Sequence, residues 1–403
     1  MKILFLTNLL PLPLDNGGKI KTYTTLCGLH QGGHQIDLLC FTEEKKVDKD
    51  IIYELGKICS SINTIYLKLT SSTNKVYMFM ILLKSLLSKY PFGIYKYISK
   101  EMKEYIKNYI KNKSYDVIYY DHLQLSVYKP LFSNLGQPVC HILDEHNCET
   151  ILVEQKKGKM PGRLFFFIEA KKYRNFERVA ILSMNKTFVL SKEDYQNLKL
   201  ITGRKFSHRI IPIGISDRGI KKDREEDGIL NMLFLGTLTW EPNNRGIIWF
   251  LKNIMPKLNE KYKKLNLYIV GKTPSNELKN IATKFNNVVI TGYVESVDEY
   301  YNKSDFMIVP LFTGSGQRVK IIEAFSKGMP VISTTLGAEG LFSTDGIDIL
   351  IADTKKEFYD KIQALTKSSL RKKISINSRK LYEQYYSIQS VGKKVNNAIS
   401  DVR

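Results

Sequence analysis

The sequence predicts an α/β protein of two doubly wound parallel-sheet domains in tandem, and three observations carry this prediction. Short apolar runs alternate with helical patterns twice along the chain, as consecutive βαβ units do. A polar stretch separates the two series. The chain has 403 residues, which is too long for one ordinary core and favours two domains.

The first series predicts an N-terminal domain over residues 1–210. Its expected strands are 3–7, 36–41, 62–67, 116–120, 139–143 and 187–190. A helix is expected over 18–30, after a loop that contains Gly17 and Gly18. Residues 211–228 hold a proline, three glycines and a run of charges, which is typical of a linker.

The second series predicts a C-terminal domain over residues 229–380, with strands at 232–235, 267–270, 288–291, 306–311 and 331–334. The last segment, 381–403, reads as a helix that could pack back on the N-terminal domain. Ligands of doubly wound sheets bind at the carboxyl ends of the strands. A cleft between the two domains is therefore the expected ligand site.

Composition and charge limit the classes of partner. The net charge of +21 favours an anionic partner, which could be nucleotide phosphate, an acidic membrane surface or nucleic acid. A general bias of the composition towards lysine explains part of this charge equally well. Five scattered cysteines predict free thiols in a reducing cytosol. The histidines lack metal spacing, and no apolar run approaches the ~20 residues of a membrane span.

The stretch from Phe306 to Gly340 is the most specific chemical signal. A buried strand is followed by a glycine-rich loop with Ser315, Gly316 and Gln317, and then by a helix start that carries two cations, Arg318 and Lys320. Free backbone N–H groups and cations at a helix start suit a phosphate-bearing ligand. Glu323, about two turns further on, could bind hydroxyls of that ligand. This pattern predicts binding of a nucleotide or a nucleotide sugar.

These motifs resemble the retaining nucleotide-sugar glycosyltransferases of the GT-B fold, specifically glycosyltransferase family 4 (glycosyl transferases group 1). The resemblance covers most of the C-terminal half, in the family's order: LFLGTLTWEPN at 233–243, YIVGK at 268–272, TGYV at 291–294 and GSGQRVKIIEAFSKGMPVISTTLGAEGL at 314–341. In the N-terminal half it rests on Gly17-Gly18, LDEHN at 143–147 and IPIGI at 211–215.

The resemblance implies roles for individual residues. His146 and Asp144 would act at the donor sugar, and Arg318 and Lys320 would stabilise the leaving diphosphate. The donor would be bound by Gly17, Gly18, Gly236, Thr237, Tyr293, Val294, Ser315, Gly316, Gln317 and Glu323. His122, in YYDHLQ, is a further acceptor-side candidate.

The sequence departs from the family's pattern at two places. Ser315 stands where the family has the first of two glutamates spaced by seven residues, and Glu323 matches the second. The loop after the first C-terminal strand has no lysine and only Arg245, so its charge is expected to have moved to Arg318 and Lys320.

The expected activity is a metal-independent, retaining transfer of a sugar from a nucleotide diphosphate, with a UDP-sugar favoured, to a hydroxyl of a lipid-linked or glycan acceptor. The setting would be bacterial cell-surface polysaccharide or glycolipid synthesis, in the cytoplasm or on the inner face of the plasma membrane. No cofactor and no nucleic-acid partner are expected. The alternatives are a nucleotide-sugar epimerase of the same fold, a basic nucleic-acid-binding protein and a non-catalytic sensor of sugar nucleotides.

Residues 75–114 bear on a membrane partner. They carry nine lysines against Glu101 and Glu104, and four apolar residues repeat at helical spacing: Ile98, Met102, Ile106 and Tyr109. Such a basic amphipathic helix predicts docking on an anionic membrane. The alternative is a solvated helix whose apolar side covers the sheet.

Overall fold

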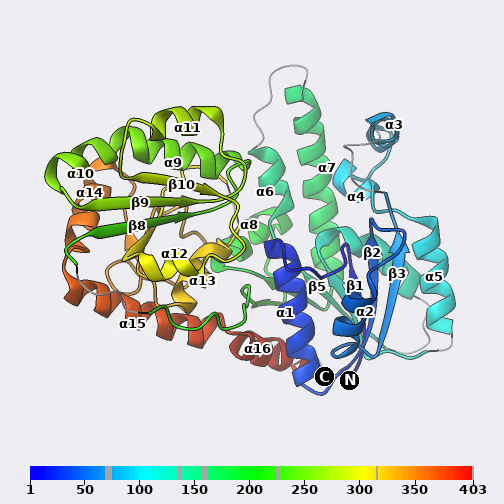
Figure 1. Cartoon of the computed structure of the whole chain (residues 1–403). Coiled ribbons are helices and arrows are strands. Elements are labelled where there is room, and N and C mark those ends of the chain that lie inside the picture. The colour runs from blue at the N-terminus through cyan, green and yellow to red at the C-terminus, as the bar shows by residue number, and fades with distance from the viewer. Residues whose placement is uncertain are drawn as a thin grey trace. The chain divides into compact units, whose positions relative to one another are not determined.

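The computed structural model describes residues 1–68, 75–111, 113–133, 138–155, 162–222, 227–314 and 316–401. The chain forms two compact units (Figure 1): unit 1 comprises Met1–Gly214 and Ile388–Arg403, and unit 2 comprises Ile215–Ser387. Each unit is built around one parallel sheet, which confirms the predicted fold class of two doubly wound α/β domains.

Unit 1 has a seven-stranded parallel sheet in the order β3-β2-β1-β4-β5-β6-β7. Its elements are β1 (Lys2–Thr7), α1 (Gly17–Gln31), β2 (Gln35–Thr42), α2 (Lys49–Gly56), β3 (Ser61–Tyr66), α3 (Lys75–Leu86), α4 (Phe92–Tyr95), α5 (Lys100–Lys111), β4 (Val117–Asp121), the 3-10 helix η2 (Leu123–Phe132), β5 (Cys140–Asp144), α6 (Glu149–Glu154), α7 (Gly162–Ser183), β6 (Lys186–Val189), α8 (Lys192–Thr202), β7 (His208–Ile210) and α16 (Ile388–Ser400).

Unit 2 has a six-stranded parallel sheet in the order β10-β9-β8-β11-β12-β13. Its elements are β8 (Leu230–Leu235), α9 (Glu241–Asn253), α10 (Met255–Lys261), β9 (Leu265–Val270), α11 (Asn276–Ala282), β10 (Val288–Gly292), α12 (Asp298–Lys303), β11 (Phe306–Val309), α13 (Val319–Ser326), β12 (Val331–Ser333), β13 (Leu350–Ile351), α14 (Lys355–Ala364) and α15 (Ser368–Tyr385). All the predicted strands are present. The two that the sequence did not reveal, β7 and β13, are short edge strands of three and two residues.

The alternation of side chains along β1 explains the layered core of unit 1. Leu4 and Leu6 point to a cluster that α5, η2, α7 and α8 cover, whereas Ile3 and Phe5 point to a cluster that α1, α2 and α16 cover. Successive residues of a strand face opposite sides, so a run that is apolar throughout is buried on both faces. The sheet therefore has helices on both sides and leaves its carboxyl-end edge for ligands.

The observed division of the chain differs in detail from the predicted one. The stretch predicted as the start of a linker continues in unit 1 to Gly214, because the N–H of Ile211 donates to the carbonyl of Val189 at 2.8 Å. Ile215 begins unit 2, where its N–H donates to Tyr386 O at 2.8 Å. The predicted helix 381–403 is in fact two elements, the end of α15 in unit 2 and α16 in unit 1.

Helix α16 packs on α1 by a close backbone contact (Figure 1). A Cβ atom on Gly28 would lie 2.5 Å from the Cα of Gly392, and one on Gly392 would lie 2.9 Å from the Cα of Gly28. The side-chain amide of Asn396 also donates to Gly28 O at 2.8 Å. Only glycine at both positions allows this approach.

We expect Gly28→Val to lower the free energy of unfolding by roughly 1–3 kcal/mol or more, because the added atoms meet backbone that cannot yield cheaply. Gly56→Ala is the matched control, since nothing lies within 4 Å of its Cβ position. Urea unfolding of the full chain measures both. Equal stability of Gly28→Val and the wild type would show that α16 does not pack tightly on α1.

The basic helix predicted from residues 98–109 is α5, and its apolar side covers the sheet. Met102 and Ile106 are fully buried in the core of unit 1. The hydroxyl of Tyr109 lies 2.8 Å from Ser61 Oγ, on β3. The helix thus adopts the alternative arrangement, in which its apolar side covers the sheet and its basic side faces solvent. Among the described residues, no helix has the length and hydropathy that crossing a bilayer requires.

Candidate active site

The centre of the candidate site in unit 1 is Asp121, the last residue of β4. In the sheet it pairs with Thr7 on one side and Asp144 on the other, at the point where strand order reverses around β1 and β4. Its Oδ2 accepts from Thr7 Oγ1 and Thr22 Oγ1, each at 2.7 Å. Ligands of doubly wound sheets bind at such reversal points.

Two histidines complete this network. His122 Nδ1 lies 3.1 Å from Asp121 Oδ2, and His146 Nε2 lies 2.8 Å from Asp121 Oδ1. The two imidazole rings are 3.6 Å apart between centroids. Because an ionised carboxylate can only accept, each nitrogen that faces Asp121 carries a hydrogen. This leaves Nε2 of His122 and Nδ1 of His146 for other partners.

The electrostatics separate the two histidines. Burial opposes the charge of Asp121, but His146 and His122 hold its pKa well below the usual range. Burial also disfavours the imidazolium of His122, yet Asp121 raises its pKa above the ordinary value. Burial and the neighbouring charge of His122 lower the pKa of His146. The proton is therefore held on His122 in preference to His146.

His122 is the histidine that faces the glycine loop. A Cβ atom on Gly18 would lie 3.5 Å from His122 Nε2 and 3.3 Å from the side-chain oxygen of Asn16. Asn16 caps α1 by accepting from Lys19 N at 3.0 Å, so Gly17 and Gly18 form the first turn of that helix. His122 has φ +80°, an uncommon left-handed value outside glycine that often marks functional sites.

Asp144 lies below this network. It is fully buried, its Oδ2 is 2.8 Å from the ammonium of Lys21, and the Tyr119 hydroxyl donates to the same oxygen at 2.5 Å. An ion pair this deeply buried needs all its partners, because removing one leaves an uncompensated charge. The geometry thus favours a supporting role for Asp144, holding α1 against the sheet below the histidines.

Asp121, His122 and His146 offer ligand atoms within 4.8 Å of one another, a spacing that a metal ion could also use. Each histidine nitrogen nearest the carboxylate already satisfies hydrogen-bond geometry with it. The two threonine hydroxyls fill further acceptor positions of Oδ2. The contacts are accounted for by a hydrogen-bonded network that fixes both rings.

In unit 2, Lys320 crosses from α13 to the loop after β8. Its ammonium donates to Leu235 O at 2.6 Å and to Asn243 Oδ1 at 2.7 Å. Burial and, to a smaller extent, the charge of Arg318 lower the pKa of Lys320 to about 7, while Glu323 works in the opposite direction. A Cβ atom on Gly236 would lie 2.9 Å from this ammonium. The charge of α13 therefore reaches the glycine loop that has no lysine of its own.

Arg318 occupies the cap position of α13 and is buried beside Trp240, with its guanidinium carbon 5.3 Å from the ring centroid. Burial lowers the pKa of Arg318, and Glu339 partly offsets this. The loop before it bends at Gly314 (φ +99°) and Gly316 (φ +85°), values that favour glycine. Ser315 lies outside the described residues. Gln317 donates to Gly340 O at 2.7 Å, joining the two glycine loops.

Glu323 is partly exposed, at 27% of its side chain, and its nearest charged partner is Arg218 at 3.6 Å. Burial raises its pKa, and Arg218 and Lys327 oppose that rise. Thr237 follows β8 and is exposed. Tyr293 and Val294 follow β10, and Tyr293 is 75% exposed. Its ring is thus free to stack on a flat ligand.

Three parts of these sites were not predicted from the sequence. The Asp121 network with Thr7 and Thr22 was missed, although Asp121 directly precedes His122 at a strand end. Asn243, which positions Lys320, carried no signal beyond its place in the first loop of unit 2. Arg218 lay in the predicted linker, within its run of charges.

Comparisons with known proteins come from three directions. Residues 230–368 match the family described as Glycosyl transferases group 1. A Klebsiella pneumoniae protein described as an uncharacterized 44.6 kDa protein in the cps region is 23% identical over 404 residues, covering 97% of both chains.

Solved structures resemble the whole chain. A sucrose-phosphate synthase from Thermosynechococcus elongatus superposes with a TM-score of 0.70 at 13% identity, covering 100% of this chain and 99% of that one. The Anabaena protein HepE in complex with UDP-glucose gives 0.62 at 14% identity over 100% of both chains. WaaG, a glycosyltransferase involved in lipopolysaccharide biosynthesis, gives 0.63 at 17% identity over 99% of both chains. The fold is the GT-B fold of these proteins, and the matches together support a glycosyltransferase.

Proposed function

We propose that this protein is a glycosyltransferase that moves a sugar from a nucleotide diphosphate donor to a hydroxyl acceptor. The observation that carries the proposal is the position of the Lys320 ammonium, which lies over Gly236 and beside the buried Arg318 at the start of α13. A diphosphate needs cations, backbone N–H groups and an approach without side chains. This part of unit 2 offers all three.

The reaction we infer breaks the bond between the anomeric carbon and the diphosphate oxygen. A bond between that carbon and the acceptor oxygen forms on the same face, and the acceptor proton leaves with the diphosphate. Lys320 and Arg318 stabilise the charge that grows on the leaving group, which is the largest contribution such a site can make. Retention of configuration, membership of family 4 and independence of metal belong to this proposal, and resemblance to the family supports them.

In unit 1, His122 is the residue we assign to the transferred sugar or its acceptor. Nδ1 is held by Asp121, so Nε2 is directed towards the start of α1, where it accepts from a sugar hydroxyl when the ring is neutral. The role requires a fixed ring more than a strong base, since orientation alone lowers barriers substantially. His146 holds the other side of Asp121 and contributes its own free Nδ1.

A UDP-sugar is the donor that the comparisons favour, because HepE is described in complex with UDP and with UDP-glucose. A cell-surface glycan or lipid-linked acceptor is favoured by WaaG and by the K. pneumoniae protein of the cps region. Glu323 would bind the ribose hydroxyls and Tyr293 the base. No cofactor is part of this proposal.

The test is thermal stabilisation and product analysis with UDP-, GDP-, ADP- and dTDP-sugars, in EDTA and with added Mg²⁺. A ligand at about 100 times its dissociation constant adds roughly 2.7 kcal/mol of stability. Stabilisation by one nucleotide family, with transfer to glycan primers that EDTA does not reduce, is expected. Binding without turnover would point to a non-catalytic sensor of sugar nucleotides, and no binding at all would refute the donor site.

Docking on an anionic membrane is part of the proposal, but through a surface other than α5. Large apolar side chains are exposed on α3, just after it, and at the start of α7: Phe79, Met80, Leu83, Leu86, Leu87, Leu164, Phe167 and Ile168. Lys172 joins the two helices by donating to Ser85 O at 2.7 Å and Leu86 O at 3.2 Å. We call these eight side chains the α3–α7 apolar surface. Lys84 and Lys171 are exposed among them, a combination that suits anionic lipid.

We expect the combined change Phe79→Ser, Leu83→Ser and Phe167→Ser to reduce binding to vesicles with 30% phosphatidylglycerol by about tenfold or more. Burying each such side chain contributes roughly 1.5–3 kcal/mol. Flotation with anionic and zwitterionic vesicles measures the effect. Ile376→Ser, at an exposed apolar position of α15, is the control. Equal flotation of all variants would contradict docking through this surface.

A further inference from the structure

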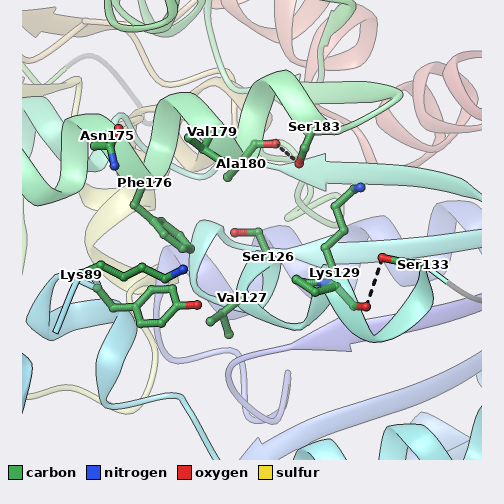
Figure 2. A pocket seen from close by; sticks show the side chains of 12 residues that line it. Lys89, Ser126, Val127, Lys129, Ser133, Asn175, Phe176, Val179, Ala180 and Ser183 are labelled. Carbon is green, nitrogen blue, oxygen red and sulfur yellow. Dashed lines mark hydrogen bonds between the residues drawn. The ribbon is translucent and has the colours of Figure 1, made fainter.

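Unit 1 contains a cavity of about 380 Å³ that none of the residues of the Asp121 network lines. Its walls are η2, the second half of α7, and the Lys89-Tyr90 segment after α3 (Figure 2). Volumes of this size are typical of small-molecule sites. The cavity begins within two turns of His122, because that residue caps η2 and Ser126 and Val127 of the same helix line the cavity.

The apolar part of the lining includes an aromatic pair. The rings of Tyr90 and Phe176 lie edge to face, 5.7 Å apart between centroids. Val127 and Val179 extend this surface, and Figure 2 shows the Phe176 ring pointing into the cavity from α7. Aromatic faces of this kind are suited to the C–H face of a sugar ring, since they bury apolar area while leaving its hydroxyls at the sides.

The polar part of the lining offers hydrogen-bond acceptors. Three serine hydroxyls donate to backbone carbonyls three residues earlier: Ser126 to Leu123 O at 2.6 Å, Ser133 to Pro130 O at 3.1 Å and Ser183 to Ala180 O at 2.7 Å. Their hydrogens are used, so towards a ligand these oxygens are acceptors. A ligand that donates several hydrogen bonds, as a polyol does, would satisfy them.

Two lysines add positive charge. Figure 2 shows the ammonium of Lys89 at one end of the cavity and that of Lys129 extending from η2 towards Ser183 at the other. Within the described part of the chain, neither has a carboxylate at ion-pair distance. The nearby acids of α7 have other partners: Glu169 lies 3.9 Å from Lys172, and Glu177 caps α6 by accepting from Glu149 N.

The positive charge of Lys129 affects the pKa of a neighbouring residue. His141, on β5, has a pKa lowered to about 4 by burial and then by repulsion from Lys129. The Tyr120 hydroxyl lies 2.9 Å from Nδ1 of His141. Among the residues that the structure describes, no carboxylate forms an ion pair with Lys129. An anionic ligand group in the cavity would do so.

We propose that this cavity binds an anionic saccharide, that is, a short sugar chain bearing a carboxylate or a phosphate. Lys89 and Lys129 would pair with the anionic group, the serine oxygens would accept from hydroxyls, and the Tyr90–Phe176 pair would contact the ring face. This inference rests on the proposed function, in which it makes the cavity a second binding site for the glycan acceptor, apart from the reacting hydroxyl.

The test compares four probes by calorimetry on the full chain: a uronic-acid disaccharide, a hexose 6-phosphate, a neutral glucose disaccharide and inorganic phosphate. We expect one of the two acidic sugars to bind the wild type at least about tenfold more tightly than the neutral disaccharide. Whether it is the uronate or the phosphate identifies the charged group. Equal affinity for acidic and neutral sugars would overturn the proposal, and so would the failure of both acidic sugars to bind. It would also be overturned if inorganic phosphate bound as tightly as the acidic sugars.

Variants assign the binding to the cavity. Lys89→Gln with Lys129→Gln should weaken binding of the acidic sugar about tenfold, since two partly exposed ion pairs with the ligand are lost together. Phe176→Leu should weaken it through loss of the ring contact. Lys192→Gln, at an exposed lysine of α8 outside the cavity, should have no effect. Unchanged affinity in the double variant would overturn the assignment.

The same variants separate this inference from the proposed function. Nucleotide-sugar binding belongs to unit 2, so the double variant should keep the wild-type stabilisation by the donor. If donors bind and transfer occurs but acidic sugars do not bind, only the second site is wrong. If acidic sugars bind in the cavity but no nucleotide binds unit 2, the proposed function fails and the cavity remains a saccharide site.

Discussion

Lys320→Met is expected to weaken the binding of a nucleotide sugar by about 10- to 100-fold. The ammonium would lie 2.9 Å from a Cβ atom on Gly236, and losing one charge-assisted hydrogen bond costs roughly 1.5–3 kcal/mol. Methionine keeps most of the volume of the side chain, so the packing over Phe234 is largely kept. Calorimetric titration at fixed ionic strength measures the change. Lys279→Met, at an exposed lysine on α11, is the matched control.

The affinity should also depend on pH near neutrality. Burial, with Arg318, gives Lys320 a pKa of about 7 in the free protein, and a bound diphosphate would raise that pKa. A group whose pKa rises on binding takes up a proton, so binding is strongest below pH 7 and weakens above it, by up to about tenfold per pH unit. A nucleotide sugar is a suitable probe because its diphosphate diester has no titratable proton near pH 7.

The variant provides the check on this interpretation. In Lys320→Met the slope between pH 7 and 8.5 should be lost, because Arg318 stays charged throughout this range. A wild-type affinity that does not change between pH 6 and 8.5, or a Lys320→Met variant with wild-type affinity, would show that the ammonium does not contact the diphosphate.

His122→Ala is expected to lower the rate of sugar transfer by about 100-fold or more while leaving donor affinity in unit 2 unchanged. The ring is held at Nδ1 by Asp121 and presents Nε2 to the start of α1, and misplacing such a group is costly for the reaction step. Steady-state kinetics with saturating donor measures the loss. His30→Gln, at an exposed histidine on α1, controls for a general effect. A rate within about threefold of the wild type would exclude a role for His122 in transfer.

Asp121→Asn tests the positioning of that ring separately. Asp121 raises the pKa of His122, and the neutral ring is the form that can accept at Nε2. Replacing the carboxylate removes the negative charge, so the pKa of His122 falls and the acid limb of the pH–rate profile moves to lower pH. A role confined to stability would reduce the amount of folded protein without moving that limb.

Prediction from the sequence was strongest where the signal is local. The alternating apolar runs placed eleven strands in two parallel sheets, because burial on both faces leaves a continuous apolar pattern. Prediction was weaker for α5, because a basic amphipathic pattern is compatible both with docking on a membrane and with packing on a sheet. Burial of Met102 and Ile106 decides for the sheet, and the exposed apolar residues lie on α3 and α7 instead.

The site residues divide in the same way. Arg318 caps α13, and Lys320 and Glu323 lie on that helix, so their closeness follows from local spacing alone. Ser315 lies outside the described residues, and its effect in place of a glutamate stays a prediction. His146 and Asp144 were both assigned to chemistry from one motif. The structure separates them, with Asp144 in a buried ion pair and His146 in the network above it.

By itself the sequence determined the two parallel sheets, the glycine loops after β8 and β11, and the cations at the start of α13. Each follows from residues close together in the chain, whose period and spacing fix their local structure. Only the tertiary structure decided which side chains meet: Asp121 joins Thr7 and Thr22 across 114 and 99 residues, and Lys320 reaches Leu235 across 85. Such contacts depend on which strands become neighbours in the sheet, and that is set by the packing of whole elements, which no local pattern records.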